Sequence, residues 1–297
     1  MPGASGGTAV GAAGKEDSFT DENLCSNRPG PRRGEPPPSR GEVMELITSR
    51  QNPLFQHIRK LRSSGGYRRR AGEFLGEGPK LLDEALRWGA EIRTVVAAEG
   101  TALPAGLPGR VVTAPADVLE SLADTQTPQG VIFACALPDI SLPARLEPGR
   151  YLVLDGVQDP GNLGTVWRTA DALGAGGLLL TGACADPYSP KAVRATMGAC
   201  FRKLPLWRGE PEEIGALLAR SGIALYATAL REDTADLRAV DLSGAAVVIG
   251  SEGKGISEEM LSLCQKALKI PMEDSCESLN AAVAAAVVLW EGRRSAG

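Results

Sequence analysis

The chain has 297 residues, 43% of them hydrophobic, and a formal net charge of -4 at pH 7. This length and apolar content allow one large or two modest domains with buried cores, and so small a net charge points to no class of partner. A single histidine and six cysteines without a C-x-x-C pair argue against a metal site, and the longest apolar run, 281–290, is about half as long as a membrane span. We therefore expect a cytoplasmic protein with reduced thiols, no metal and no membrane segment.

Composition divides the chain into four parts. Residues 1–42 are rich in Gly and Pro, with three consecutive prolines at 36–38. They are predicted to be a disordered tail, because they cannot bury enough apolar surface to offset the entropy of ordering. Residues 43–138 are predicted to form a small α/β domain, 139–149 a proline-marked linker, and 150–297 a second domain.

The start of the small domain is basic although the whole chain is acidic. Between Leu46 and Gly72 seven basic residues occur without a single Asp or Glu. They are Arg50, Arg59, Lys60, Arg62, Arg68, Arg69 and Arg70. Such asymmetry is typical of a surface that binds nucleic acid, and the interleaved Phe55, His57 and Tyr67 would stack on bases. The alternative is an exposed helix and turn that arginine makes soluble.

Helix and strand signals alternate in the rest of the small domain. Apolar residues at helical spacing predict a helix over 79–88, which Gly89 ends. Strands are predicted over 92–97, 111–113 and 130–136, and a second helix over 115–122. The mixture predicts a small α/β fold.

From Tyr151 onward strand and helix signals alternate regularly. Six apolar strands are predicted over 151–154, 178–181, 204–206, 224–229, 245–249 and 268–271. Helices are predicted to begin at Asn162, Ser189, Pro211, Ser257 and Ser278. Because the strands are apolar throughout, without alternation, they predict a parallel sheet covered by helices on both faces.

Polar loops follow three of these strands. Asn162 comes after the first strand, Glu252 after the fifth and Ser278 after the last. The carboxyl ends of parallel strands meet at one edge of a sheet, where α/β folds bind ligands, so we expect these side chains to lie close together. Neither the G-x-G-x-x-G fingerprint nor a Walker sequence is present, which excludes the usual dinucleotide and P-loop sites.

Three motifs, in order and at suitable spacing, resemble those of the SpoU (TrmH-like) branch of the SPOUT superfamily of RNA 2'-O-ribose methyltransferases. They are 155–168, 249–256, and 270–272 together with 278–280. Segments 187–191 and 194–199 also resemble sequence segments of this family. Residues 74–82 are similar to the start of a substrate-binding domain that accompanies many members, so the resemblance spans nearly everything from residue 45 onward.

The resemblance implies S-adenosylmethionine as methyl donor, a ribose 2'-hydroxyl of RNA as acceptor with ribosomal RNA favoured, a C-terminal trefoil knot, and a homodimer. It assigns catalysis to Arg168, Asn162, Glu252, Ser278 and Asn280. It assigns cofactor binding to Gly250, Ser251, Gly253, Ile270, Met272, Ser278 and Leu279. The seven basic residues between Leu46 and Gly72 are the predicted RNA-binding side chains.

Arg168 is the residue that the resemblance makes responsible for activating the hydroxyl. A guanidinium can stabilise a developing alkoxide and grip a neighbouring phosphate. It is a poor proton acceptor, because arginine is effectively always protonated. Our hypothesis is that Arg168 is an electrostatic clamp, which binds the charged oxygen and the phosphate. In this hypothesis Asn162 orients Arg168 or the ribose, and Glu252 binds the guanidinium of Arg168.

Other functions stay open from the sequence. One is the same reaction on transfer RNA, and another is a catalytically silent RNA-binding module that keeps the fold as a scaffold. The retained polar residues argue against a silent module, since polar groups are awkward to bury without a purpose. A small-molecule nucleotide enzyme is disfavoured by the basic segment and by the additional domain.

Overall fold

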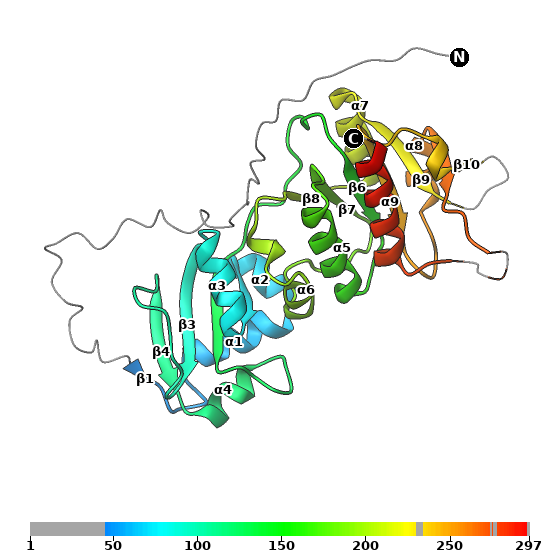
Figure 1. The fold of residues 1–297 in the computed structure, drawn as a ribbon. Helices are drawn as coiled ribbons and strands as arrows, with labels where there is room; N and C mark the ends of the chain where they lie inside the picture. Colours follow the sequence, from blue (N-terminus) through cyan, green and yellow to red (C-terminus); the bar gives the residue numbers. More distant parts are fainter. Residues whose placement is uncertain (1–44, 230–233, 274, 276–277, 296–297) are drawn as a thin grey trace, which may run out of the picture. The chain divides into compact units, whose positions relative to one another are not determined.

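The computed structural model describes residues 45–229, 234–273, 275 and 278–295. The predicted tail, 1–42, lies outside the described residues. The described part contains two β-sheets with helices on their faces, the first within residues 45–136 and the second within residues 151–269 (Figure 1). None of its helices combines the length and the apolar character that crossing a bilayer requires.

The N-terminal sheet has five strands in the order β1-β4-β3-β5-β2. They are β1 (Glu45–Leu46), β2 (Glu73–Glu77), β3 (Ile92–Ala98), β4 (Arg110–Ala114) and β5 (Val131–Ala136). β3 runs parallel to β4 and antiparallel to β5, so the sheet is mixed. Gly76 sits opposite Phe133, where a Cβ would lie 2.2 Å from the ring, and only glycine leaves that space.

Four helices cover this sheet. They are α1 (Pro53–Ser63), α2 (Gly65–Ala71), α3 (Pro79–Arg87) and α4 (Ala116–Leu122). The side chain of Asn52 accepts a hydrogen bond from the Leu54 amide and so caps α1, and Ser64 caps α2 in the same way. α1 and α4 pack on one face of the sheet, while α3 packs on the other.

The second sheet has seven strands in the order β10-β12-β9-β11-β6-β7-β8. They are β6 (Tyr151–Asp155), β7 (Gly177–Thr181), β8 (Leu206–Arg208), β9 (Ala224–Thr228), β10 (Ala235–Asp236), β11 (Ala245–Gly250) and β12 (Lys266–Lys269). Every neighbouring pair is parallel, as the sequence predicted.

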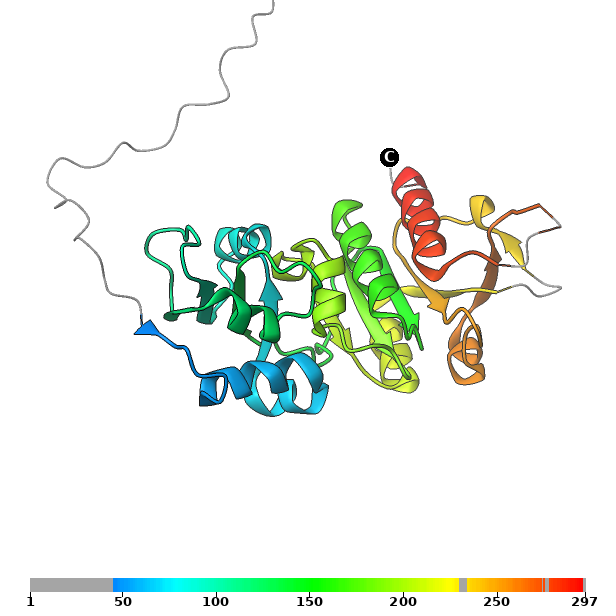
Figure 2. The ribbon, with the colours of Figure 1, turned by 90° about the horizontal axis from the view of Figure 1, so that it is seen from below.

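Helices cover both faces of the second sheet (Figures 1 and 2). They are α5 (Pro160–Ala172), α6 (Pro190–Ala195), α7 (Pro211–Ser221), α8 (Glu258–Leu263) and α9 (Ala281–Ser295), with 3-10 turns at Ala199–Phe201 and Leu237–Ala239. Leu152 and Leu154 of β6 pack with α5 and α9, whereas Tyr151 and Val153 pack with α7 and α8. Alternate residues of an apolar strand therefore serve two separate cores.

The two sheets share one hydrophobic core cluster. The ring of Phe74 in β2 lies 4.9 Å from that of Tyr188 and 5.9 Å from that of Phe201, measured between centroids. A partly buried ion pair adds to this contact, because the buried guanidinium of Arg68 donates to Asp186 at 2.6 and 3.0 Å. The aromatic contacts and the ion pair join the N-terminal sheet to the second sheet.

Several boundaries differ from the sequence prediction. α5 begins at Pro160, with Asp159 and not Asn162 as its cap, because the Asp159 carboxylate accepts the amide of Asn162 at 2.8 Å. α9 begins at Ala281 and is capped by Asn280, not by Ser278. The predicted caps Ser189 and Ser257 are correct. The two-residue strand β10 was missed, since so short a segment carries no periodic signal.

Candidate functional site

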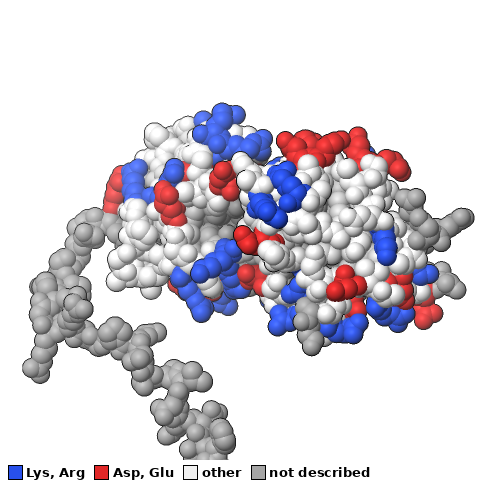
Figure 3. Space-filling view, turned by 90° about the horizontal axis from the view of Figure 1, so that it is seen from above, with Lys and Arg blue, Asp and Glu red and all other residues white. Residues whose placement is uncertain are grey.

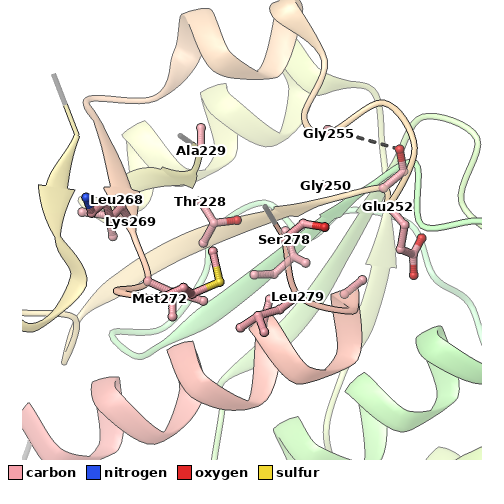
Figure 4. Close-up of a pocket in the computed structure, with 15 residues that line it drawn as sticks. Thr228, Ala229, Gly250, Glu252, Gly255, Leu268, Lys269, Met272, Ser278 and Leu279 are labelled. Carbon is pink, nitrogen blue, oxygen red and sulfur yellow. Dashed lines mark hydrogen bonds between the residues drawn. The ribbon is translucent and has the colours of Figure 1, made fainter. Parts of the chain in front are cut away.

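A cavity opens at the carboxyl ends of β9, β11 and β12 (Figure 4). Its lining combines the loop after β11, the segment after β12 and the start of α9. The lining residues are Thr228, Ala229, Ile249, Gly250, Ser251, Glu252, Gly255, Leu268, Lys269, Ile270, Met272, Ser278, Leu279, Ala281 and Ala284. In Figure 4 the Met272 side chain extends toward Thr228 across the cavity. The site thus lies at the sheet edge where the sequence placed it.

The loop after β11 is a tight turn that exposes backbone to the cavity. The amide of Ser251 donates to the Gly255 carbonyl at 3.0 Å, and the amide of Gly255 donates back to Ser251 at 2.9 Å. A Cβ on Gly250 would lie 2.3 Å from the Gly255 carbonyl carbon, so the turn tolerates only glycine there. Gly255 itself has a φ of 69°, which favours glycine.

Six of the seven predicted cofactor residues line this cavity, and Gly253 does not. The six are Gly250, Ser251, Ile270, Met272, Ser278 and Leu279. Sequence reasoning missed Thr228 and Ala229, which lie at and directly after the end of β9. In the sheet order β9 stands between β11 and β12. The rule that parallel strands end at a ligand site finds both residues only once β9 is known to lie between its two neighbours, and their loop carries no motif.

The chemistry of the lining fits an adenosyl ligand that carries a positive charge. Ile249, Ile270 and Leu279 provide apolar walls for a flat ring, and the exposed backbone around Gly250 provides donors and acceptors. The carboxylate of Glu252 adds a negative charge at the edge of the cavity. The residues present therefore fit S-adenosylmethionine.

Three of the predicted catalytic residues form one hydrogen-bonded group at the edge of the cavity. The side-chain amide of Asn162 donates to the carboxylate of Glu252. The amide of Asn280 donates to the side-chain oxygen of Asn162 at 3.1 Å. The side-chain oxygen of Asn280 also accepts the amide of Ala282 at 2.9 Å, which ties the group to the start of α9. We call Asn162, Glu252 and Asn280 the polar trio.

Arg168 lies on α5, outside the polar trio. Its side chain is exposed, and within the described residues it makes no hydrogen bond or ion pair. The expected ion pair between Glu252 and the Arg168 guanidinium is not present among the described residues. The carboxylate of Glu252 accepts a hydrogen bond from Asn162 instead. Among the described residues this guanidinium is therefore not engaged, and it is available to a ligand.

Asp159 connects the start of α5 to α6. One carboxylate oxygen accepts a hydrogen bond from the backbone amide of Asn162 at 2.8 Å. The other accepts a hydrogen bond from the Lys191 ammonium at 2.6 Å. The hydrogen bond from Lys191, followed by that from the Asn162 amide, holds the pKa of Asp159 below its ordinary value. Asp159 is therefore ionised at neutral pH and supports the position of Asn162.

The predicted RNA-binding side chains divide into exposed and engaged groups. Lys60, Arg69 and Arg70 are exposed and make no ion pair within the described residues. Arg50 is exposed but pairs with Asp117 at 2.6 Å. Arg59 and Arg62 are partly buried and donate to the backbone or side chains around α1 and α4. On the face in Figure 3, Lys and Arg gather in separate clusters with acidic side chains between them.

Three residues of the basic segment have structural roles that correct the prediction. Arg68 is only 4% exposed, and besides Asp186 it donates to the Leu61 carbonyl at 2.5 Å. Its guanidinium is occupied by these carboxylate and carbonyl partners, so it is not available to bind a phosphate. Phe55 is fully buried in the core of the small domain and cannot stack on a base. Both ring nitrogens of His57 also have hydrogen-bond partners. Nδ1 lies 2.9 Å from the Tyr67 hydroxyl, and Nε2 lies 2.7 Å from the Glu73 carboxylate.

No group of three His, Cys, Asp or Glu side chains within the described residues is arranged to hold a metal ion. The described cysteines Cys135, Cys184, Cys200 and Cys264 are free thiols. Burial raises the pKa of Cys135 and of Cys200 to about 12, so both thiols are protonated at neutral pH. These cysteines are packing residues.

Comparison with known families matches both halves of the chain. Residues 149–290 match the SpoU rRNA Methylase family, and residues 42–133 match the MRM3-like substrate binding domain. The first match contains the polar trio and the cavity lining after β11. The second contains the basic segment and the five-stranded sheet up to the middle of β5.

Individual relatives are similar to the chain over most of their own length. The chain is 31% identical to the 23S rRNA (guanosine(2553)-2'-O)-methyltransferase RlmP of Bacillus subtilis, covering 84% of this chain and 100% of that protein. It is 39% identical to the tRNA (guanosine(18)-2'-O)-methyltransferase of Thermus thermophilus, but over only 50% of this chain and 77% of that protein. The AdoMet-bound rRNA methyltransferase from Sinorhizobium meliloti has a similar structure, with a TM-score of 0.75, 32% identity, and coverage of 84% of this chain and 98% of that one.

Proposed function

The chain belongs to the SpoU rRNA methylase family, and from this membership we propose that it transfers a methyl group from S-adenosylmethionine to a ribose 2'-hydroxyl of RNA. The observation that carries the proposal is the polar trio at the edge of a cavity whose lining fits the methyl donor. A site that places an acceptor sugar beside a bound donor needs such polar groups at the cavity mouth.

When bound, S-adenosylmethionine supplies the reactive methyl group on its sulfonium. Gly250, Ile270 and Leu279 hold the adenosyl part through backbone groups and apolar contact, and Ser251, Met272 and Ser278 complete the binding site. Gly253 leaves this set, since it does not line the cavity. The apolar walls exclude water from the donor.

The polar trio positions the acceptor. Asn162, held between Glu252 and Asn280, has its side chain fixed by hydrogen bonds on both sides, so it can orient a ribose without losing side-chain entropy on binding. Ser278 lies next to this group and lines the cavity. We assign Ser278 and Asn280 to the boundary between donor and acceptor.

Arg168 acts as an electrostatic clamp. Its guanidinium stabilises the charge that develops on the 2'-oxygen and grips an adjacent phosphate, while the proton leaves to a phosphate oxygen or to water. An exposed and unpaired arginine supports this assignment, because it needs no release from a protein partner before it binds RNA.

A homodimer is part of the proposal. α9 exposes apolar side chains, with Val283 50% and Trp290 62% exposed, and it packs beside α5, which carries Arg168. Exposed apolar side chains of this size, seven residues apart on one helix, support a protein interface. Covering this face with a second copy would bring Arg168 near the pocket of the partner. Sedimentation or light scattering measures the mass in solution.

Ribosomal RNA is the favoured substrate class. The substrate-binding match covers residues 42–133, and the tRNA-modifying relative matches only half of this chain. We retain the division into a substrate-binding domain over 43–138, a linker over 139–149 and a methyltransferase domain over 150–297. The exposed cations Lys60, Arg69 and Arg70, together with Arg50, Arg59 and Arg62, bind the RNA backbone. Free, buried thiols support a cytoplasmic location.

The test is direct methyl transfer. The purified protein is incubated with methyl-labelled S-adenosylmethionine and deproteinised ribosomal RNA, with transfer RNA as a parallel acceptor. A 2'-O-methyl group protects the adjoining phosphodiester from alkali, so label is expected in alkali-resistant dinucleotides of ribosomal RNA. Label on a base would overturn the ribose assignment. Donor binding without any transfer would favour the silent RNA-binding module.

A further inference from the structure

We propose that Lys191 and Arg194 of α6 bind two phosphates of the substrate RNA and lead its backbone from the small domain to the polar trio. This inference rests on the proposed function and adds a substrate-positioning element to it. Neither residue belongs to the basic segment that the sequence singled out. Both side chains lie between the small domain and the start of α5, keep unused hydrogen-bond donors, and stand on a helix that is packed tightly against α5.

Lys191 lies at the start of α5. A Cβ on Gly161 would be 3.5 Å from the Lys191 Cε, so the lysine stem runs along the first turn of that helix. Its Nζ donates to Asp159 at 2.6 Å, and the other oxygen of the same carboxylate accepts the Asn162 amide at 2.8 Å. The carboxylate of Asp159 therefore links the Lys191 ammonium to Asn162, a member of the polar trio.

Arg194 continues the row toward the small domain. It stands three residues after Lys191 on α6, a spacing that puts both side chains on the same side of a helix. Its Nη1 donates to Asp124 at 2.9 Å, and the side chain lines a cavity together with Arg62 of α1. Lys191, Arg194 and Arg62 thus form a row of cations from the start of α5 to the small domain.

Both cations have unused capacity. Lys191 uses one of its three ammonium donors and Arg194 one of its five guanidinium donors in the hydrogen bonds of the described residues. Their side chains are 56% and 39% exposed. Exposed ion pairs contribute at most about 1 kcal/mol, so a phosphate can share or displace Asp159 and Asp124 at little cost. Charge-assisted hydrogen bonds to phosphate are stronger than neutral ones.

The helix α6, which carries Lys191 and Arg194, is packed tightly against α5. A Cβ on Gly164 of α5 would lie 2.4 Å from the Ala192 carbonyl oxygen and 2.6 Å from the Ala195 Cβ. The backbones of α5 and α6 therefore touch, and α6 cannot shift without moving the helix that begins beside Asn162. A phosphate bound to α6 is consequently placed at a defined position relative to the polar trio.

The test compares Lys191→Gln, Arg194→Gln and the double variant with a matched control. Arg110→Gln is the control, since it also removes one exposed arginine from an ion pair, with Glu45, whose partners are 51% and 55% exposed. The probe is fluorescently labelled fragments of ribosomal RNA, titrated over a range of salt concentrations with full-length protein. Calorimetry with S-adenosylmethionine and thermal melting run in parallel.

The double variant is expected to bind RNA about tenfold more weakly near physiological salt, with the slope of log Kd against log salt reduced by about 1.4, since each contact to a single strand contributes about 0.7. The Arg110→Gln protein should keep the wild-type Kd and slope. Donor affinity should be unchanged in all variants. An unchanged Kd and slope in the double variant would overturn the inference.

Asp159→Asn separates RNA binding from a structural role of Lys191. Asparagine still caps α5 but removes the carboxylate charge that faces the lysine. If Lys191 binds phosphate, Asp159→Asn leaves RNA affinity unchanged or raises it, whereas Lys191→Gln lowers it. Equal losses in both variants, with equal falls in melting temperature, would mean that Lys191 only supports the cap. Wild-type methyl transfer is measured alongside, so failure of the proposed function is recognised separately.

Discussion

The side-chain amide of Asn162 joins Glu252 to Asn280, donating to the carboxylate and accepting from the second amide at 3.1 Å. The three residues follow β6, β11 and β12, and 118 residues separate the two asparagines. Asn162 is the only member of the trio that contacts both others within the described residues, so its amide determines whether the group forms.

Reversing the polarity of this group tests its architecture. Asn162→Asp places two carboxylates against each other and should lower the free energy of unfolding by about 1 kcal/mol. Adding Glu252→Gln supplies an amide donor to the new carboxylate and should restore most of that loss. Chemical denaturation measures both. A double variant no more stable than the single one would mean that the Asn162–Glu252 hydrogen bond does not hold the site together.

Arg168→Lys keeps a positive charge but loses the two-pronged grip of the guanidinium. We expect kcat to fall by about 100-fold, the usual effect of removing one group that stabilises transition-state charge. Affinity for S-adenosylmethionine and the melting temperature should stay near wild type, because the side chain is exposed and outside the cavity lining. Normal turnover in this variant would refute the clamp.

Two glycines of one loop should respond differently to alanine. A Cβ on Gly250 would lie 2.3 Å from the backbone of Gly255, so Gly250→Ala must open the turn and should abolish donor binding in calorimetry. Nothing lies within 4 Å of a Cβ on Gly253, so Gly253→Ala should bind S-adenosylmethionine as wild type does. Loss of binding in the second variant would restore Gly253 to the cofactor site.

Adjacent arginines of α2 should separate stability from RNA binding. Arg68→Met leaves Asp186 without its ion-pair partner and should lower the free energy of unfolding by about 1 to 3 kcal/mol. Arg69→Met removes an exposed charge, so it should leave stability unchanged and weaken RNA binding in a salt-dependent way. Equal stability of the two variants would contradict the anchoring role of Arg68.

Buried thiols should resist alkylation until the protein unfolds. Burial, together with the nearby Cys200, raises the pKa of Cys135 from 9.0 to about 12, and burial does the same for Cys200. Native protein at pH 8.5 should therefore show no iodoacetamide label at either position by mass spectrometry, and urea-unfolded protein should show both. The stability linked to these protons is complete below the ordinary thiol pKa of 9.0 and is lost as pH rises toward about 12. Rapid native labelling would show that the core opens.

Much of the site was predictable because its residues occur in short local patterns. The apolar runs of β6 and β11 predicted parallel strands, and the polar residues directly after them predicted where Asn162 and Glu252 would meet. Thr228 was not predictable in the same way, because its place in the cavity depends on β9 lying between β11 and β12. The trefoil knot, which strand order alone does not test, stays a prediction.

The alternation of strands and helices, the two-sided burial of the second sheet and the family motifs could all be predicted from the amino-acid sequence, since each is encoded within a few neighbouring residues. The different roles of two similar side chains became visible only in the folded chain. Arg68 and Arg69 are consecutive, yet one is buried against Asp186 and the other is exposed. Packing between segments 118 residues apart sets the burial and the partner of Arg68, and local periodicity does not encode such packing.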